Sequence, residues 1–131
     1  MNKSSWTNLI SIHRKNCETI IGFSKEIRYA GAFNEYGRTI SGKIKSGVKP
    51  IFSPNAVREE FFAIASAMRL RQKSAKGLGE LQYVLIKHKK ISVMLFSQNN
   101  ITYYITLNSK VNPNPTLVTK IKKLIAKNNY S

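Results

Sequence analysis

Three runs of Ile, Val, Leu, Tyr and Phe, separated by short polar breaks, dominate the second half of the chain. They cover residues 81–87, 91–97 and 101–107. Runs of this length between turn-forming residues predict three antiparallel strands joined by tight connections. The last run alternates apolar and polar positions, whereas the first two are apolar at almost every position. Because a strand that is apolar on both faces is covered on both, we expect a sheet with helices on each side.

Apolar positions three and four residues apart predict three amphipathic helices. The first spans about residues 6–22. A capping Ser53 before a proline starts the second, which runs to about residue 74. Asn114 before Pro115 starts the third in the same way.

Between the first two helices, aromatic and β-branched residues with little helical periodicity predict a β-hairpin. Residues 27–33 and 38–45 predict its two strands, and residues 34–37 its turn, in which Gly37 supplies a positive φ. The order helix, strand, strand, helix, strand, strand, strand, helix then predicts a single α+β domain over residues 1–131. Residues 1–5 and 129–131 are expected to be flexible ends.

The charge of the chain is far from balanced. It carries 22 Lys and Arg residues against six Glu, for a formal net charge of +16. Such an excess favours an anionic partner, either a nucleic acid, an acidic membrane surface or an acidic protein, although a compositional habit of the host is the alternative. The basic residues form three clusters along the chain: Lys43, Lys45 and Lys49; Arg69, Arg71, Lys73 and Lys76; and Lys87, Lys89 and Lys90. They could serve as a sequence-independent nucleic-acid patch, because contacts to phosphate read no base sequence.

The sequence offers little for catalysis or metal binding. His13 and Cys17 lie four residues apart on one helix face, but zinc needs three or four ligands and the chain has no second Cys. We therefore expect both residues in the core, and predict a protein that is not an enzyme and holds no metal or cofactor. The single Cys fits a reducing compartment. With no apolar segment of membrane-spanning length and no leader pattern, the sequence predicts a cytoplasmic protein.

The predicted hairpin carries a resemblance to a known family. Residues 27–41, which read Ile-Arg-Tyr-Ala-Gly-Ala-Phe-Asn-Glu-Tyr-Gly-Arg-Thr-Ile-Ser, resemble the hairpin of roadblock/dynein light chain proteins, within the profilin-like class. Together with Gly-Val-Lys-Pro at residues 47–50, this sequence is most similar to that of small roadblock-like proteins of ammonia-oxidising archaea. The resemblance implies a five-stranded antiparallel sheet, with the first and last helices on one face and the middle helix on the other.

The same resemblance implies a function. Roadblock-like proteins are non-enzymatic modules that dimerise through the middle helix and the strand after it, and several bind or regulate small GTPases or act as scaffolds. Carried onto this chain, the homodimer interface comprises Phe62, Ser66, Leu70, Gln82, Val84 and Ile86. The expected partners are a second copy of the chain and a small GTPase or another acidic protein. Two alternatives stay open: the nucleic-acid binder described above, and a small-molecule sensor with a profilin-like cleft.

Overall fold

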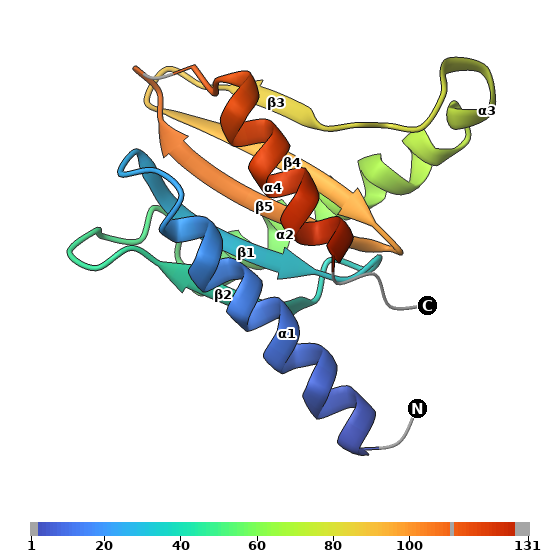
Figure 1. The fold of residues 1–131 in the computed structure, drawn as a ribbon, viewed down its shortest axis with the longest axis horizontal. Coiled ribbons are helices and arrows are strands. Elements are labelled where there is room, and N and C mark those ends of the chain that lie inside the picture. The colour runs from blue at the N-terminus through green and yellow to red at the C-terminus, as the bar shows by residue number, and fades with distance from the viewer. Residues whose placement is uncertain (1–2, 111, 128–131) are drawn as a thin grey trace.

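The computed structural model describes residues 3–110 and 112–127 of the chain (Figure 1). The elements follow in the order α1 (Lys3–Ile21), β1 (Ile27–Phe33), β2 (Thr39–Ile44), α2 (Pro54–Gln72), α3 (Ala75–Leu78), β3 (Val84–Lys87), β4 (Ile91–Gln98), β5 (Ile101–Asn108) and α4 (Pro115–Lys127). The predicted α+β order is confirmed, with one addition, the single turn of helix α3. The expectation of flexible ends at residues 1–2 and 129–131 lies outside the described residues, whereas residues 3–5 belong to α1.

The strands form one five-stranded antiparallel sheet in the order β2-β1-β5-β4-β3. The predicted hairpin and the predicted meander are therefore joined side by side, because β1 pairs with β5 along most of its length. This arrangement leaves β2 and β3 as the two edge strands (Figure 1).

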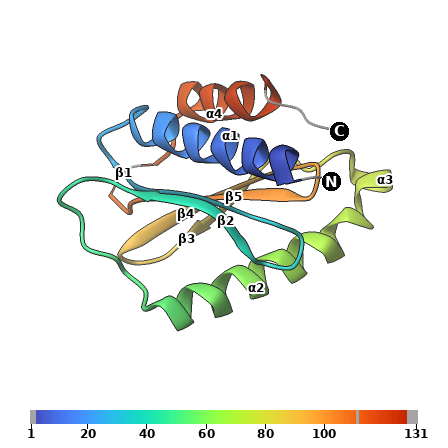
Figure 2. The same cartoon turned by 90° about the horizontal axis from the view of Figure 1, so that it is seen from below.

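Helices cover both faces of the sheet, as expected from the strands that are apolar on both faces. Figure 2 shows α1 and α4 together on one face and α2 alone on the other. β5 explains how one strand serves both layers: Tyr103 and Ile105 point into the core under α1 and α4, and Tyr104 points into the core over α2. The alternation expected for this strand is confirmed.

The apolar stripe predicted for the first helix is buried only over its second half. His13, Cys17 and Ile20 are buried, whereas Trp6, near the start of the helix, is 48% exposed. The prediction that His13 and Cys17 belong to the core is confirmed. Burial raises the pKa of the Cys17 thiol to about 12, with the nearby Glu18 carboxylate adding to the shift, so this thiol stays protonated at neutral pH.

Two predicted boundaries need correction. The first strand of the meander begins at Val84 and not at residue 81, and α2 ends at Gln72, two residues before the predicted end. Residues 73–83, which include α3, therefore form an irregular connection between α2 and β3. Periodicity alone does not reveal this break, because Leu81 and Tyr83 continue the apolar alternation of the strand even though no ladder pairs them.

Candidate interaction surface

Helix α2 is the only helix on its face of the sheet within the described residues. Ser53 caps it, since its Oγ accepts a hydrogen bond of 3.2 Å from the amide of Ala56. Its buried residues Phe61, Ala65 and Met68 pack on the sheet. Five strands spaced about 4.8 Å apart span about 19 Å, whereas a helix is only about 10 Å wide. One helix therefore leaves a flank of the sheet uncovered on each side.

One flank of α2 faces the turn between β1 and β2. Gly37, in this turn, has φ +82°, and a Cβ built on it would lie 2.7 Å from the Cα of Phe62. Asn34 holds the turn, because its Oδ1 accepts hydrogen bonds from the amides of Tyr36 (2.9 Å) and Arg38 (3.0 Å). The Arg69 guanidinium, from α2, donates to the carbonyl of Glu35. The glycine therefore permits the close contact that fixes α2 against the hairpin.

This flank carries two large exposed aromatic side chains. Phe62 is 61% exposed and Tyr36 is 63% exposed. Arg58, four residues before Phe62 on the same helix face, Arg69, and Arg38 in the turn are also exposed. We name Tyr36, Arg38, Arg58, Phe62 and Arg69 the turn-side patch. Aromatic residues surrounded by arginines are the composition that is enriched at protein–protein interfaces.

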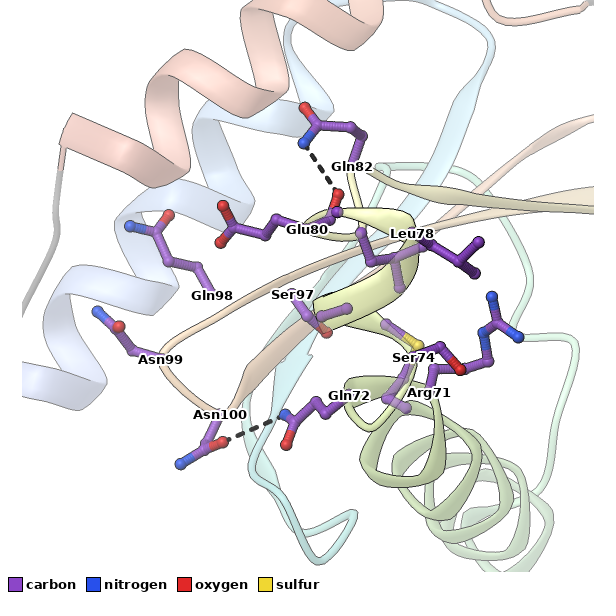
Figure 3. Close-up of a pocket in the computed structure, with 14 residues that line it drawn as sticks. Arg71, Gln72, Ser74, Leu78, Glu80, Gln82, Ser97, Gln98, Asn99 and Asn100 are labelled. Carbon is purple, nitrogen blue, oxygen red and sulfur yellow. Dashed lines mark hydrogen bonds between the residues drawn. The ribbon is translucent and has the colours of Figure 1, made fainter.

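The other flank of α2 borders a cavity of about 510 Å³ (Figure 3). It lies between the end of α2, the connection that includes α3, and the turn between β4 and β5. Figure 3 shows Gln72 and Asn100 meeting at one end of the cavity, where Gln72 Nε2 and Asn100 Oδ1 are 3.5 Å apart, with Glu80 and Gln82 at the other end. Beside it, Leu78 is 75% exposed. The cavity therefore has polar ends and an exposed apolar side chain at its border.

The same connection explains why β3 begins late. Gln82 donates a hydrogen bond of 3.2 Å to the carbonyl of Glu80, and its side-chain oxygen accepts one from Lys122 on α4. Residues 80–82 make these contacts instead of pairing with β4, and a second cavity, of about 370 Å³, lies between the connection and α4. Ser97 and Gln98 of β4 line both cavities and have no β3 partner.

The six residues predicted for the dimer interface come from three parts of the chain. Phe62, Ser66 and Leu70, four residues apart, form one stripe on α2, in which Phe62 lies beside the β1–β2 turn and Leu70 is 64% exposed. Val84 and Ile86 lie at the opposite edge of the sheet, half-buried against the core over α2, and Gln82 belongs to the connection.

The three basic clusters likewise lie apart. Lys43 is on β2 and Lys87 is on β3, at opposite edges of the sheet. Arg71 lies near the end of α2, beside the β4–β5 turn. Several of these cations already have partners: Lys45 Nζ donates to the carbonyl of Ser24 (2.8 Å), and Lys87 Nζ to that of Ser109 (2.7 Å). No observation on the described residues supports the nucleic-acid alternative over a solvated basic surface.

A buried polar network lies on the α1/α4 face, away from these surfaces. The Tyr103 hydroxyl accepts a hydrogen bond of 2.9 Å from Asn16 Nδ2 and forms another, of 2.5 Å, with His13 Nδ1. Burial lowers the pKa of His13. Its other ring nitrogen, Nε2, is buried without a hydrogen-bond partner among the described residues. His13 is therefore a neutral core residue.

Two other kinds of site are absent from the part of the chain that the structure describes. Residues 3–110 and 112–127 contain no group of three or more His, Cys, Asp or Glu side chains that could hold a metal ion. No helix among them is long and apolar enough to cross a membrane.

The chain is similar to known proteins in its structure. No family model and no curated protein matches the sequence. A crystal structure of a Roadblock/LC7 domain from Streptomyces avermitilis superposes with a TM-score of 0.67 at 8% identity, covering 87% of this chain and 92% of that one. The gliding protein MglB from Thermus thermophilus gives a TM-score of 0.70 at 12% identity, covering 90% and 88%. Profilin II from Acanthamoeba castellanii gives 0.56 at 15% identity, covering 88% and 97%.

These likenesses extend over nearly the whole length of each chain, and their identities are low. They therefore describe the fold and not the chemistry of particular residues. The chain has the roadblock/profilin-like α+β fold that its sequence predicts.

Proposed function

We propose that the chain is a non-enzymatic interaction module of roadblock type, which forms a homodimer and binds a small GTPase or another protein with an acidic surface. The observation that carries the proposal is the exposed apolar surface around α2, on a face of the sheet that a single helix covers. The fold is similar to that of MglB, one structure of which has a tetrameric arrangement. The buried Cys17, with its raised pKa, supports a role in packing rather than as a nucleophile.

The proposed dimer surface is the β3 side of the α2 face. It combines Leu70 on the outer face of α2 with the open edge of β3, where Val84 and Ile86 lie. An exposed edge strand offers unpaired backbone groups to a second strand, so two copies related by a two-fold axis would join their sheets edge to edge. Phe62 and Ser66, which the sequence also predicts for the interface, lie toward the β1–β2 turn.

The proposed partner surface is the turn-side patch. Its two aromatic side chains supply apolar area, and its three arginines supply positive charge that complements an acidic partner. The net charge of +16 would speed the encounter with such a partner at low ionic strength. Because the patch and the β3 edge lie on different flanks of α2, dimerisation leaves the patch accessible.

Sedimentation equilibrium tests the dimer. The unmodified chain is expected to sediment as a dimer at tens of micromolar, and Leu70→Glu is expected to weaken association by about thirtyfold, as for a truncated hot-spot residue. Trp6→Glu is the matched control, since Trp6 is exposed on α1 at the other face of the sheet. A chain that stays monomeric, or a dimer that Trp6→Glu disrupts and Leu70→Glu does not, contradicts the proposed interface.

The partner is tested with purified small GTPases of the host, each loaded with GDP or with a GTP analogue. Binding measured by biolayer interferometry is expected for at least one of them and is expected to be lost in Arg58→Glu. Lys123→Glu, an equal change of charge on the exposed side of α4, is expected to keep binding. If both variants lose binding equally, the net charge and not the turn-side patch is responsible.

Two finer expectations stay predictions. The likeness of residues 27–50 to archaeal roadblock-like proteins is one, and a cytoplasmic location is the other. Location is tested by fractionating host cells and probing each fraction with an antibody to the chain.

A further inference from the structure

A cavity of about 420 Å³ lies at the opposite end of α2 from the cavity of Figure 3. It is enclosed by the sheet, the first turns of α2 and the loop that runs from β2 to α2 around the edge of the sheet (Figure 2). Its walls are mainly apolar, and the side chains that form them include Ile44, Val48, Pro50, Phe52, Val57 and Phe61. Its volume lies in the range of pockets that hold small organic molecules.

Polar atoms without partners lie among these apolar walls. Thr106, on β5, lines the cavity and is only 4% exposed, and its hydroxyl has no hydrogen-bond partner among the described residues. Arg28 also lines the cavity, and its Nε is buried without a partner in this part of the chain, although Arg28 Nη1 donates to Asn108 Oδ1 at 3.3 Å. A buried polar group without a partner costs free energy, so these two donors are the atoms that a ligand would satisfy.

Register in the sheet brings these two residues together. Ile27 pairs with Leu107 and Tyr29 pairs with Thr106, so Arg28 is the extra residue of a β-bulge beside Thr106. The bulge also places Ile27 in the core under α1 and Tyr29 against the core over α2, on opposite faces of the sheet. A bulge that turns an arginine toward an apolar cavity is a local departure from regular pairing, of the kind that redirects side chains at binding sites.

The ring of Tyr29 forms part of the floor of the cavity. It lies across two glycines, Gly31 on β1 and Gly42 on β2, and a Cβ on either would overlap its hydroxyl group. Burial raises the pKa of Tyr29 to about 12, with a smaller contribution from Cys17, so the phenol stays neutral. The charged residues that line the cavity are Arg28 and Lys49, and the Tyr104 hydroxyl on its wall donates a hydrogen bond of 2.6 Å to the Glu60 carboxylate.

We propose that this cavity binds a small monocarboxylic acid with an apolar tail. The carboxylate accepts hydrogen bonds from Arg28 Nε and from the Thr106 hydroxyl, and the tail lies along the apolar walls formed by the β2–α2 loop and α2. A carboxylate is the complement of a guanidinium, and hydrogen bonds to ionised groups are the stronger ones. An amine would meet two positive charges, and an anion without a tail would leave the apolar walls in contact with water.

The binding test uses the full ¹⁵N-labelled chain titrated with octanoate, and separately with 1-octanol and octylamine, at physiological salt. Octanoate is expected to shift the amide resonances of Tyr29, Val57 and Thr106 in a saturable manner. It is expected to bind about tenfold tighter than octanol, the difference that one charge-assisted hydrogen bond supplies. Octylamine is expected to leave these resonances unchanged. Equal binding of octanoate and octanol, or octanoate shifts scattered over the basic surface, would overturn the proposal.

Variants separate the site from the general positive charge. Arg28→Met is expected to remove the preference for octanoate over octanol, and Thr106→Val, which keeps the side-chain shape, to weaken octanoate binding severalfold. Arg14→Met removes the same charge from an exposed position on α1 and is expected to bind as the unmodified chain does. Val48→Trp, at a half-buried loop position, is expected to fill the cavity and abolish binding of both compounds. If Arg28→Met and Arg14→Met weaken octanoate binding equally, the cavity is not the site.

Discussion

The two faces of the sheet are built differently. On one face α1 and α4 lie side by side, and thirteen of the described residues form a buried core that draws on both helices and on β1, β4 and β5. On the other face α2 lies alone, and its core contains only seven buried residues within the described chain. Because apolar burial stabilises a fold roughly in proportion to the area removed from water, the α1/α4 face supplies more of the stability.

The α2 face buries fewer residues than the α1/α4 face, and it carries cavities and exposed apolar side chains. The cavities of about 510 and 420 Å³ border opposite ends of α2, and the exposed Phe62 and Leu70 lie on it. A face that one helix covers incompletely is thus available for recognition while the opposite face holds the fold together. We infer that stability and recognition are divided between the faces, and the following predictions test that division in order of expected effect.

The largest effect is expected from truncating a core residue of the α1/α4 face. Ile121 on α4 is fully buried, so Ile121→Ala is expected to lower the free energy of unfolding by about 2–5 kcal/mol, through lost burial and the cavity left behind. Phe62→Ala, at an exposed position on α2, is expected to change it by less than about 0.5 kcal/mol. Urea denaturation followed by circular dichroism measures both. A similar loss from the two variants would contradict the division.

A smaller effect is expected where α2 meets the β1–β2 turn. Gly37→Ala forces a side chain into a positive φ and against the backbone of Phe62, and is expected to cost about 2 kcal/mol or more. Gly47→Ala is the matched control, since Gly47 has nearly the same φ, +81°, but nothing within 4 Å of a built Cβ. Gly47→Ala is expected to lower the free energy of unfolding only by the cost of a positive φ in alanine, about 1 kcal/mol. Equal losses of unfolding free energy would mean that the contact with α2 does not matter.

The third prediction concerns the buried His13. Its pKa is lowered in the folded state, so the unfolded chain binds the proton more readily. The neutral ring therefore contributes to the free energy of unfolding in full above the unfolded pKa of about 6.5. This contribution is lost as the pH falls from there toward the folded pKa, by at most about 1.4 kcal/mol per pH unit. Unfolding at about pH 7.5 and 5.5 is expected to show this dependence in the unmodified chain and in His88→Gln, and to show less of it in His13→Gln. An unchanged dependence in His13→Gln would assign it to other groups.

The smallest effect is expected at the helix caps. Asn114 Oδ1 accepts a hydrogen bond of 2.7 Å from the amide of Leu117 at a part-buried position, so Asn114→Ala is expected to cost about 1 kcal/mol. The corresponding bond of Ser53 on α2 is longer, 3.2 Å, and exposed, so Ser53→Ala is expected to cost less. Thermal unfolding of the two variants, side by side, gives the ranking, and the reverse order would contradict it.

Much of the fold follows from local pattern. The alternation of β5, the Ser-Pro and Asn-Pro helix starts and the turn that ends in Gly37 are all encoded within a few residues, and the structure has each of them where the sequence predicts it. The pairing of β1 with β5 is not local, and the resemblance to the roadblock family implies only that all five strands form one sheet.

The surfaces could not be predicted in the same way. Just before β3 begins, Gln82 bonds to Glu80 and to Lys122, which is forty residues away, and periodicity does not reveal such contacts. The separation of Phe62 from Val84 depends on which flank of α2 meets Gly37, and periodicity gives the apolar face of a helix but not its rotation against a particular turn. Arg28 lies beside Thr106 only because of a bulge in the sheet, and periodicity does not reveal a bulge.

The most direct test of the division between the two faces is hydrogen exchange of the unmodified chain, measured below and above the concentration at which it associates. On association, the amides of α2 and of residues 80–87 are predicted to exchange more slowly, while those of α1 and α4 keep their rates. Protection that appears on α1 and α4, or exchange that does not depend on concentration anywhere, would contradict the account.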